Sequence, residues 1–375
     1  MATIYLIRHC EAEGNACRRA QAQTDTLVTR KGYEQSEMLR RRFKGVDIDA
    51  LYSSDAFRSI ITVTPIAEER GLPIKVRLSL REITTGIWED RAWGNIAKEY
   101  PAEHKVWTET PWITTVPGAT TFQQAADRVV FCLRRIAAEV GDGTALVVSH
   151  SCSIKASLCV MQGKAMTQVG EVGHGENTSV SLLEIAQNGS IHVVYINDAS
   201  HLPTRLCRAW NGVAGNDINM VIEPCNLELQ ENILSTLAEA DHRERGVKFD
   251  CQAYLFAVHE QLQREPRSIA ISYLKGNPVG FVRLGQDSEL PADCGVLEQY
   301  YVTPELRGKW YGEQLLGYAV HEMRYTGKTR LALRKKCSDE ERRLLERFTF
   351  HEMNGHPEYE ELNLYSPPCP YPILA

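Results

Sequence analysis

The sequence lacks the features that mark several broad classes of protein. No uncharged apolar stretch in it approaches the roughly 18–20 residues that a membrane-spanning helix needs. Its 42 lysine and arginine residues are outnumbered by 48 aspartate and glutamate residues, which gives a formal net charge of −6. An acidic chain has no global electrostatic attraction to nucleic acid or to an anionic membrane. We therefore expect neither as a partner, and any affinity for phosphate must be local.

Several smaller features are also missing. Eleven cysteines in 375 residues are too few for a disulfide scaffold, their number is odd, and no pair has the CxxC spacing. Residues 1–9 have neither the basic segment nor the long apolar run of a signal peptide. No internal repeat, low-complexity segment or cluster of metal-ligand spacing is visible. These absences predict a globular protein with reduced thiols, located in the cytoplasm.

The chain is long enough for two or three domains, and its pattern changes once. Up to about residue 196, short buried strands alternate with amphipathic helices, which predicts a parallel-rich α/β sheet. Strands are expected at 3–7, 50–52, 144–148 and 180–184, and helices at 32–43 and 121–140. We place the first domain at residues 1–204, a linker poor in periodicity at 205–216, and a second domain at 217–375.

In the second domain the strands and helices do not strictly alternate, which predicts a separate α+β unit. The expected strands lie near 218–222 and at 268–274, 279–284, 296–302 and 330–333, and the expected helices at 227–240, 251–263, 312–324 and 339–348. The segment 275–278 carries a turn signal between two apolar runs, which predicts a hairpin.

Two histidines and two arginines are predicted at the carboxyl ends of buried strands. Arg8 and His9 end the first strand, and His150 ends a later one. Arg58 follows another strand, on the first turn of a helix. The carboxyl ends of parallel strands open into the ligand crevice of such sheets. Guanidinium groups bind phosphate oxygens in bidentate fashion and a neutral imidazole can attack phosphorus, so this arrangement indicates phosphoryl chemistry.

Several motifs along residues 3–202 occur in the order typical of one family. They are 6–15 (LIRHCEAEGN), 27–35 (LVTRKGYEQ), 52–58 (YSSDAFR), 80–89 (LREITTGIWE), 117–118 (PG), 148–150 (VSH), 177–180 (NTSV) and 197–202 (NDASHL). Through them the first domain resembles the histidine phosphatase (phosphoglycerate mutase-like) superfamily. The last two motifs are more similar to those of small cofactor-independent phosphatases, including the α-ribazole phosphatase type, than to those of the glycolytic mutases.

This resemblance implies a three-layer α/β domain and a histidine acid-type phosphatase, which is a phosphoric monoester hydrolase. It implies that His9 is the nucleophile that becomes phosphohistidine and that Glu82 gives a proton to the leaving group. The residues that it implies for phosphate binding are Arg8, Asn15, Arg58 and His150. The expected substrate is a small phosphomonoester, and neither a metal ion nor another cofactor is expected in this domain.

The first domain departs from the family pattern beside the expected site. Cys10 follows the first histidine where the family usually has glycine, and Ser151 and Cys152 follow the second where it usually has two glycines. Side chains at such positions add bulk where a phosphate must approach the backbone. Lower turnover, an altered substrate preference and phosphate binding with little catalysis all remain open. If the thiol crowds the phosphate, Cys10→Gly should raise turnover.

The second domain has one informative segment, residues 296–312 (VLEQYYVTPELRGKWYG). It predicts a strand, a turn and an Arg/Gly-rich loop that opens a helix, where backbone N–H groups can bind pyrophosphate. With the order of elements, it resembles the GNAT N-acetyltransferase family, although Trp310 stands where that loop usually has its first glycine. The resemblance implies acetyl-CoA or another acyl-CoA as ligand. Glu298, near the start of the strand, is either a candidate base or a surface carboxylate. The residues that the resemblance implies for acyl-CoA binding are Tyr301, Val302, Arg307, Gly308, Lys309 and Gly312.

We therefore expect a phosphomonoester hydrolase fused to a GNAT-like domain, with a second, acetyltransferase activity left open. One alternative is an N-acetyltransferase whose phosphatase-like domain only binds a phosphorylated acceptor. Another is a non-catalytic ligand-binding protein. A mutase would need a bisphosphorylated primer, and the motif at 177–180 argues against it. The phosphorylated substrate, the acyl acceptor and the oligomeric state stay open.

Overall fold

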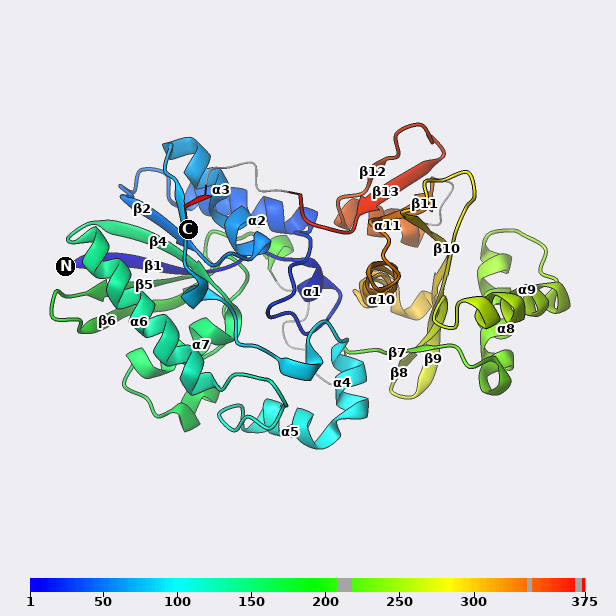
Figure 1. The fold of residues 1–375 in the computed structure, drawn as a ribbon, viewed down its shortest axis with the longest axis horizontal. Helices are drawn as coiled ribbons and strands as arrows, with labels where there is room; N and C mark the ends of the chain where they lie inside the picture. Colours follow the sequence, from blue (N-terminus) through cyan, green and yellow to red (C-terminus); the bar gives the residue numbers. More distant parts are fainter. Residues whose placement is uncertain (208–217, 336–338, 368–372, 375) are drawn as a thin grey trace.

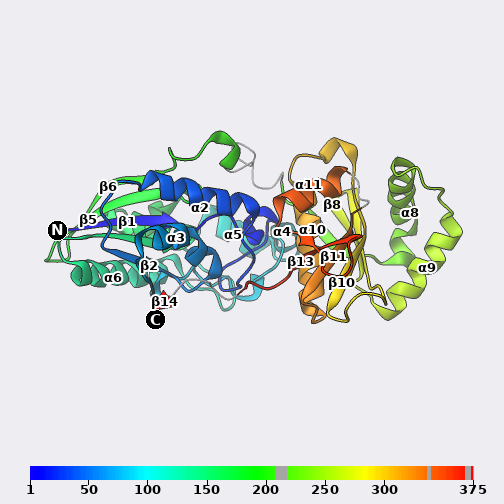
Figure 2. The ribbon, with the colours of Figure 1, turned by 90° about the horizontal axis from the view of Figure 1, so that it is seen from above.

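The computed structural model describes residues 1–207, 218–335, 339–367 and 373–374. These residues form two α/β units that lie side by side, each built on one seven-stranded sheet (Figures 1 and 2). The fold class is therefore the one that the sequence predicted. Among the described helices, none is long and apolar enough to cross a membrane.

The first sheet has the strand order β14-β3-β2-β4-β1-β5-β6. The first five strands of this order run parallel, and β5 and β6 are antiparallel to their neighbours. Its strands are β1 (Ala2–Arg8), β2 (Ala50–Ser53), β3 (Ile74–Val76), β4 (Thr144–Ser149), β5 (Val180–Ile185), β6 (Ile191–Asp198) and β14 (Ile373–Leu374). The helices of this unit are α1 (Glu13–Ala16), α2 (Arg30–Arg42), α3 (Phe57–Arg70), α4 (Trp93–Glu99), α5 (Pro101–Glu109), α6 (Phe122–Val140) and α7 (Ser151–Met161).

Helices cover both faces of this sheet, because its central strands are apolar on both faces. On one face, α6 and α7 pack over strand residues such as Ile4 and Val147. On the other face, α2 and α3 pack over residues such as Ile7 and Val148. Neighbouring residues of one strand point to opposite faces, so a continuous apolar strand needs cover on both. The predicted three-layer arrangement is confirmed.

The second sheet has the strand order β12-β13-β11-β10-β9-β8-β7. Its strands are β7 (Val221–Pro224), β8 (Ile269–Leu274), β9 (Asn277–Gly285), β10 (Cys294–Val302), β11 (Arg330–Arg334), β12 (His351–Glu352) and β13 (Tyr359–Asn363). Helices α8 (Leu227–Glu244) and α9 (Cys251–Arg264) cover one face, and α10 (Tyr311–Tyr325) and α11 (Asp339–Arg347) the other. Lys275 and Gly276 form the predicted hairpin turn with positive φ at both residues, as a type I′ turn requires.

Two features of the second sheet bear on ligand binding. The parallel strands β10 and β11 pair only along residues 294–296 of β10, after which β10 continues toward Val302 paired with β9 on its other side. A bulge interrupts β10 between Leu297 and Gln299, which places Glu298 at the irregular position. Bulges bend a strand and redirect its side chains, so the sheet is opened beside Glu298.

The connection between the units is only partly described. Of the linker predicted at 205–216, residues 208–216 lie outside the described residues. Its first residues lie at the end of a 3₁₀ turn (Thr204–Leu206), where the Leu206 carbonyl accepts a hydrogen bond from Gln35. Late in the chain, β14 returns to the first unit and pairs in parallel with β3.

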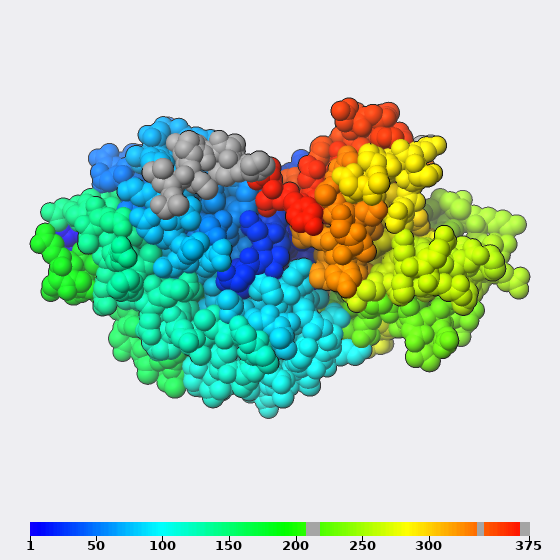
Figure 3. Space-filling model, viewed as in Figure 1, coloured from blue at the N-terminus to red at the C-terminus, as the bar shows by residue number. Residues whose placement is uncertain are grey.

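The two units are in contact through α1 and α4 of the first and β7 and α10 of the second. In the space-filling view, blue and cyan segments of the first unit lie directly against the orange segment of the second (Figure 3). Gly94 of α4 lies against the backbone of Met220, where a side chain would clash. Asn95 adds two hydrogen bonds with the backbone of Ile222.

Candidate active site

His9 lies where β1 ends, at the meeting point of three segments. Its backbone N–H donates to the Ser149 carbonyl at the end of β4, and its carbonyl accepts from Asn177 Nδ2 at 2.9 Å. The imidazole is buried, and Nδ1 lies 2.7 Å from the Cys10 carbonyl. A carbonyl can only accept, so Nδ1 carries the proton and Nε2 keeps its lone pair. Nε2 has no hydrogen bond within the described chain, which leaves it for a ligand.

Arg58 holds the fixed positive charge of the site. It stands on the first turn of α3 and is fully buried. Its Nη groups donate to the carbonyls of Thr24 and Ala22 at 3.1 and 2.9 Å. Its Nε makes no hydrogen bond to any described residue, so a buried donor is left for a ligand.

His150 completes the pair of rings. Its centroid lies 5.1 Å from that of His9. Nδ1 is 3.2 Å from an Nη atom of Arg58, and Nε2 is 2.8 Å from Ser54 Oγ. Because a guanidinium can only donate, Nδ1 accepts and the Nε2 proton points to the serine. The motif at 52–58 predicted no role for Ser54, and the structure shows that it orients this ring.

Both rings are kept neutral by their surroundings. The pKa of His9 and of His150 lies well below the usual 6.5, first because of burial and then because of the positive charge of Arg58. Arg8 lowers both pKa values further, so its charge also acts at the two rings. Arg8 Nη1 donates to the Gly175 carbonyl at 2.6 Å, which ties it to the loop before β5. The structure thus brings Arg8, Arg58 and the two histidines together.

Glu82 lies on the same side of the sheet, against the start of α7. One carboxylate oxygen accepts from the Cys152 N–H at 2.9 Å and the other from the Ser153 N–H at 2.8 Å. A carboxylate at a helix N-terminus satisfies free N–H groups and interacts favourably with the helix dipole. Glu82 therefore fixes the helix that begins directly after His150.

Asn15 is held by hydrogen bonds within the protein itself. Its Oδ1 accepts from the Ala12 N–H at 3.1 Å and lies 3.5 Å from Asn177 Nδ2. Asn177 also holds the His9 carbonyl, so these two amides fix the loop around the ring. The predicted contact of Asn15 with phosphate stays a prediction.

Cys10 does not crowd the predicted site. Its side chain is buried in an apolar cluster with Val28, Phe57 and Ile61, and Sγ faces the Arg58 carbonyl at 3.5 Å. Burial raises the pKa of this thiol to about 11, so it is a neutral packing group at ordinary pH. The structure gives no reason to expect faster turnover from Cys10→Gly.

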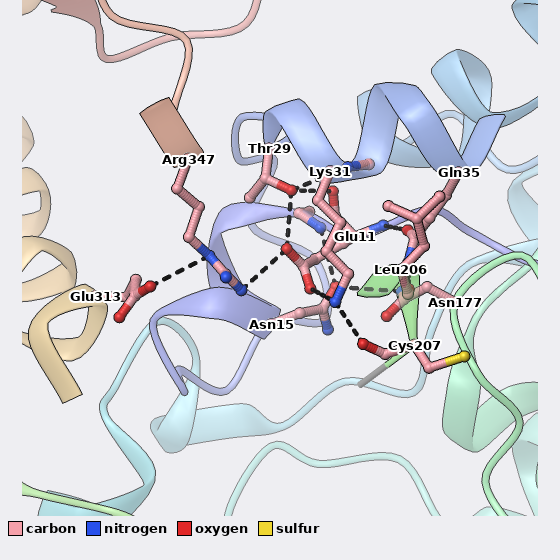
Figure 4. A network of polar contacts seen from close by, with 12 residues as sticks. Glu11, Asn15, Thr29, Lys31, Gln35, Asn177, Leu206, Cys207, Glu313 and Arg347 are labelled. Atoms are coloured by element: carbon pink, nitrogen blue, oxygen red, sulfur yellow. Dashed lines mark hydrogen bonds and ion pairs between the residues drawn. The ribbon is translucent and has the colours of Figure 1, made fainter. Parts of the chain in front are cut away.

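A buried carboxylate two residues after His9 joins the site to the second unit (Figure 4). Glu11 lies 3.2 Å from Lys31 Nζ and accepts from Thr29 Oγ1 at 3.0 Å. Arg347 of α11 reaches it from the other unit at 3.3 Å. The guanidinium of Arg347 also lies 3.5 Å from the centroid of the Trp310 ring, which places it between the two units.

The predicted acyl-CoA residues surround the start of α10. Tyr301 and Val302 end β10, and Arg307 donates to the Val302 carbonyl at 2.8 Å while its guanidinium lies over the Tyr301 ring. Lys309 donates to the Glu305 carbonyl at 2.8 Å. Beside them is a hollow of about 510 Å³; the residues that line it are Gly308, Trp310, Glu313, Arg343, Leu344, Glu346 and Arg347. The hollow lies at the N-terminus of α10 and is lined by two arginines and two glutamates.

Comparison with known families decides the classification. The model of the "Histidine phosphatase superfamily (branch 1)" matches residues 4–199, which is just over half of the chain. The chain belongs to this superfamily. The model of the "Acetyltransferase (GNAT) family" matches residues 234–350, so the C-terminal region is a GNAT domain. The fusion that the sequence motifs predicted is confirmed.

Individual relatives match the histidine phosphatase domain. "Phosphoserine phosphatase 1" of Hydrogenobacter thermophilus is 25% identical over 202 residues, which are 54% of this chain and 95% of that protein. "Probable phosphoglycerate mutase GpmB" of Salmonella typhi is 30% identical over 154 residues, 41% of this chain and 72% of that protein. The solved structure "Bacillus stearothermophilus YhfR" is 26% identical with a TM-score of 0.52, covering 54% of this chain and 99% of its own. The domain is thus of the phosphatase and mutase type.

Proposed function

We propose that the first domain hydrolyses a small phosphomonoester through a phosphohistidine formed on His9. One observation supports this above the others: Nδ1 of the buried ring donates to the Cys10 carbonyl, so Nε2 is an unprotonated nucleophile. The charges of Arg58 and Arg8 act at the same ring. A nucleophile beside fixed cations is what phosphoryl transfer requires, because charge develops on the phosphoryl oxygens.

The proposed reaction has two steps. Nε2 of His9 forms a bond to phosphorus while the bond to the leaving oxygen breaks, and Glu82 gives that oxygen a proton. Water then attacks phosphorus, Glu82 takes its proton, and inorganic phosphate leaves the regenerated imidazole. Arg8, Arg58 and His150, with Asn15, would hold the phosphoryl oxygens during both steps.

Hydrolysis of p-nitrophenyl phosphate tests the proposal. His9→Ala should lower kcat/KM by on the order of a thousandfold or more, because the nucleophile itself is removed. Acid quenching after exposure to a radiolabelled phosphomonoester should leave label on the unaltered protein and none on the variant. His192→Ala is the matched control, since that histidine is exposed and lies on the edge strand β6. Equal turnover by His9→Ala, or no retained label, contradicts the proposal.

We propose hydrolysis rather than mutase activity, as the motif at 177–180 indicated. The relatives named above include both a phosphatase and a mutase, so the comparison itself allows either. Phosphate release from 3-phosphoglycerate without a bisphosphorylated primer would support the hydrolase. Conversion to 2-phosphoglycerate that depends on such a primer would contradict it. Location in the cytoplasm stays a prediction from the sequence.

A second function is favoured by the opening between β10 and β11. We propose that the GNAT domain binds acetyl-CoA there, with Tyr301, Val302, Arg307, Gly308, Lys309 and Gly312 as its binding residues. When bound, that ligand supplies an acetyl thioester. Glu298 stands in the bulge of β10 as the candidate base. Its side chain is about one-third exposed and lies 3.1 Å from Arg283, and partial desolvation raises the pKa of its carboxyl. Calorimetric titration with acetyl-CoA should show saturable heat that acetyl-pantetheine, which lacks the phosphates, does not reproduce. No heat with acetyl-CoA contradicts this proposal.

A further inference from the structure

A buried lysine close to the phosphoryl site has no matching acid. Lys155 of α7 is 9% exposed. Within the described chain, no carboxylate lies within ion-pair distance of its Nζ, and its one polar contact is with His174 Nε2 at 3.5 Å. Burial lowers the pKa of this ammonium. An ammonium group carries three donors and is costly to bury without partners, so this one is poorly satisfied.

His174 connects the lysine to the residue that follows His150. Its Nδ1 lies 2.8 Å from the Oγ of Ser151, and its Nε2 faces Lys155. Since the ammonium can only donate, Nε2 accepts from it, and Nδ1 carries the proton and donates a hydrogen bond to the serine oxygen. Ser151 therefore keeps its own hydroxyl proton for another acceptor. The ammonium, the serine hydroxyl and the imidazole thus lie together in one place, without a carboxylate in ion-pair distance of the ammonium among the described residues.

The cluster adjoins the cations of the phosphoryl site. Gly175, next to His174 in the chain, accepts from Arg8 Nη1. On the first turn of α7, burial and then Glu82 raise the pKa of the Cys152 thiol, while Lys155 and Arg8 both lower it. Both cations therefore act at the same point, directly after His150. A ligand whose phosphate contacts Arg8 would therefore lie close to Ser151, Lys155 and His174, which we call the lysine cluster.

We infer that Ser151, Lys155 and His174 form a subsite for a second anionic group of the substrate, beside the phosphoryl site. The inference rests on the proposed function and narrows its substrate class to phosphomonoesters of small acids. An acid group would accept from the serine hydroxyl and from the ammonium, and it would supply the missing negative charge. The serine at this position is one of the departures from the family pattern, which fits an altered substrate preference.

A lysine in the loop that follows α7 has different surroundings. Lys164, just beyond α7, is paired with Glu171 at 2.7 Å and is about one-third exposed. It has its acid and its water. Lys155 is only 9% exposed and has no such acid, although it lies five residues from His150.

Two esters that differ only by a carboxylate test the subsite: O-phosphoserine and O-phosphoethanolamine. The unaltered protein should prefer O-phosphoserine in kcat/KM by about 10- to 100-fold, as a charged hydrogen bond provides. Lys155→Met should bring the ratio close to one, and Lys155→Arg should restore part of it. Lys164→Met is the control and should leave both activity and ratio unchanged. The ratio of kcat/KM for propane-1,3-diol bisphosphate to that for propyl phosphate shows whether a second phosphate is recognised as well as a carboxylate.

Binding to the His9→Ala protein separates this inference from the proposed function. A preference for O-phosphoserine in titration that Lys155→Met abolishes upholds the subsite, even if no ester is hydrolysed. A ratio near one in the unaltered protein overturns it. So does a ratio that Lys155→Met leaves intact, provided that thermal unfolding shows the variant to be folded.

Discussion

Burial is the main influence on the titrating residues near the site. It lowers the pKa of His9 and His150 well below 6.5, and it lowers that of His201 to about 4. His201 accepts from Arg42 and lies 3.1 Å from Thr178 Oγ1, in the segment that supports His9. Neutral rings suit a nucleophile, but they also couple the stability of the fold to pH.

Acidification from pH 7 to 5 should therefore destabilise the protein. In that interval the unfolded chain binds protons on these imidazoles while the folded chain does not, so stability rises with pH and is lost as pH falls below 6.5. The loss is up to about 1.4 kcal/mol per histidine and pH unit. Denaturant unfolding at pH 7, 6 and 5 measures it. His201→Asn should reduce the dependence of the unfolding free energy on pH, and the exposed His192→Asn should not. The same pH dependence in all three proteins would contradict the low pKa of His201.

The proposed role of Glu82 has a signature that a structural role lacks. A proton donor matters most for a leaving group that is strongly basic. Glu82→Gln should therefore slow hydrolysis of an alkyl phosphate by about 100-fold or more, and that of p-nitrophenyl phosphate much less. Loss of the bonds to α7 alone would slow both substrates equally. The ratio of the two rates, measured at one pH, distinguishes the cases.

At the scale of elements, α6 shows how local chemistry fixes a boundary. Thr121 Oγ1 accepts from the Gln124 N–H at 3.0 Å, and Gln124 Oε1 accepts from the Thr121 N–H at 2.9 Å. This capping box satisfies two donors that the helix start would leave free. The helix lies over the central strands, so fraying there would loosen one face of the sheet.

Thr121→Ala should lower the free energy of unfolding by about 1 kcal/mol, because one capping acceptor is lost. Thr121→Ser keeps the hydroxyl and should cost much less. Urea denaturation of the two variants side by side gives the difference. Equal stabilities would mean that tertiary packing alone sets the start of α6.

The elements that the sequence predicted are those with strong apolar patterns. Strands β1 and β4 are continuous apolar runs, and helix α6 has a periodic apolar pattern. All three begin and end within a residue or two of the expected bounds. The edge strand β6 was missed because most of its residues are half-buried or exposed and leave no such pattern. Strand β14 was missed because two residues have no pattern at all; only its pairing with β3 defines it.

The site residues that could be predicted are those at the ends of apolar strands. Arg8, His9 and His150 follow directly from the position of β1 and β4. The lysine cluster was missed because Lys155 on an amphipathic helix looks like any solvated charge until its burial is known. Glu11 and Arg347 are 336 residues apart, and no local pattern predicts such a contact.

At the scale of the whole molecule, buried charges join the two units. Arg324 of α10 binds both carboxylate oxygens of Glu13, at 2.9 and 2.8 Å. His321 of the same helix lies 2.7 Å from Asp90. The Glu13 side chain is 2% exposed, so it depends on its partner from the other unit. Removing one member of a buried pair leaves an uncompensated charge.

Arg324→Ala should thus cost about 3–5 kcal/mol of stability. Arg334→Ala removes an arginine from an exposed pair with Asp287 and should cost less than about 1 kcal/mol. Calorimetry shows the loss as a lower Tm and should also show the units unfolding further apart in temperature. Equal small effects for the two variants would mean that the interface contributes little.

The return of β14 to the first sheet and the reach of Arg347 to Glu11 decide how this polypeptide can be divided. A fragment ending near residue 207 would lose the strand that pairs with β3, the partner of Glu13, and one of the two cations at Glu11. We expect such a half-protein to be prone to aggregation, and an inactive preparation of it would say nothing about the chemistry of His9. The two units should therefore be studied by point substitution in the intact polypeptide, because each contributes contacts that complete the structure of the other.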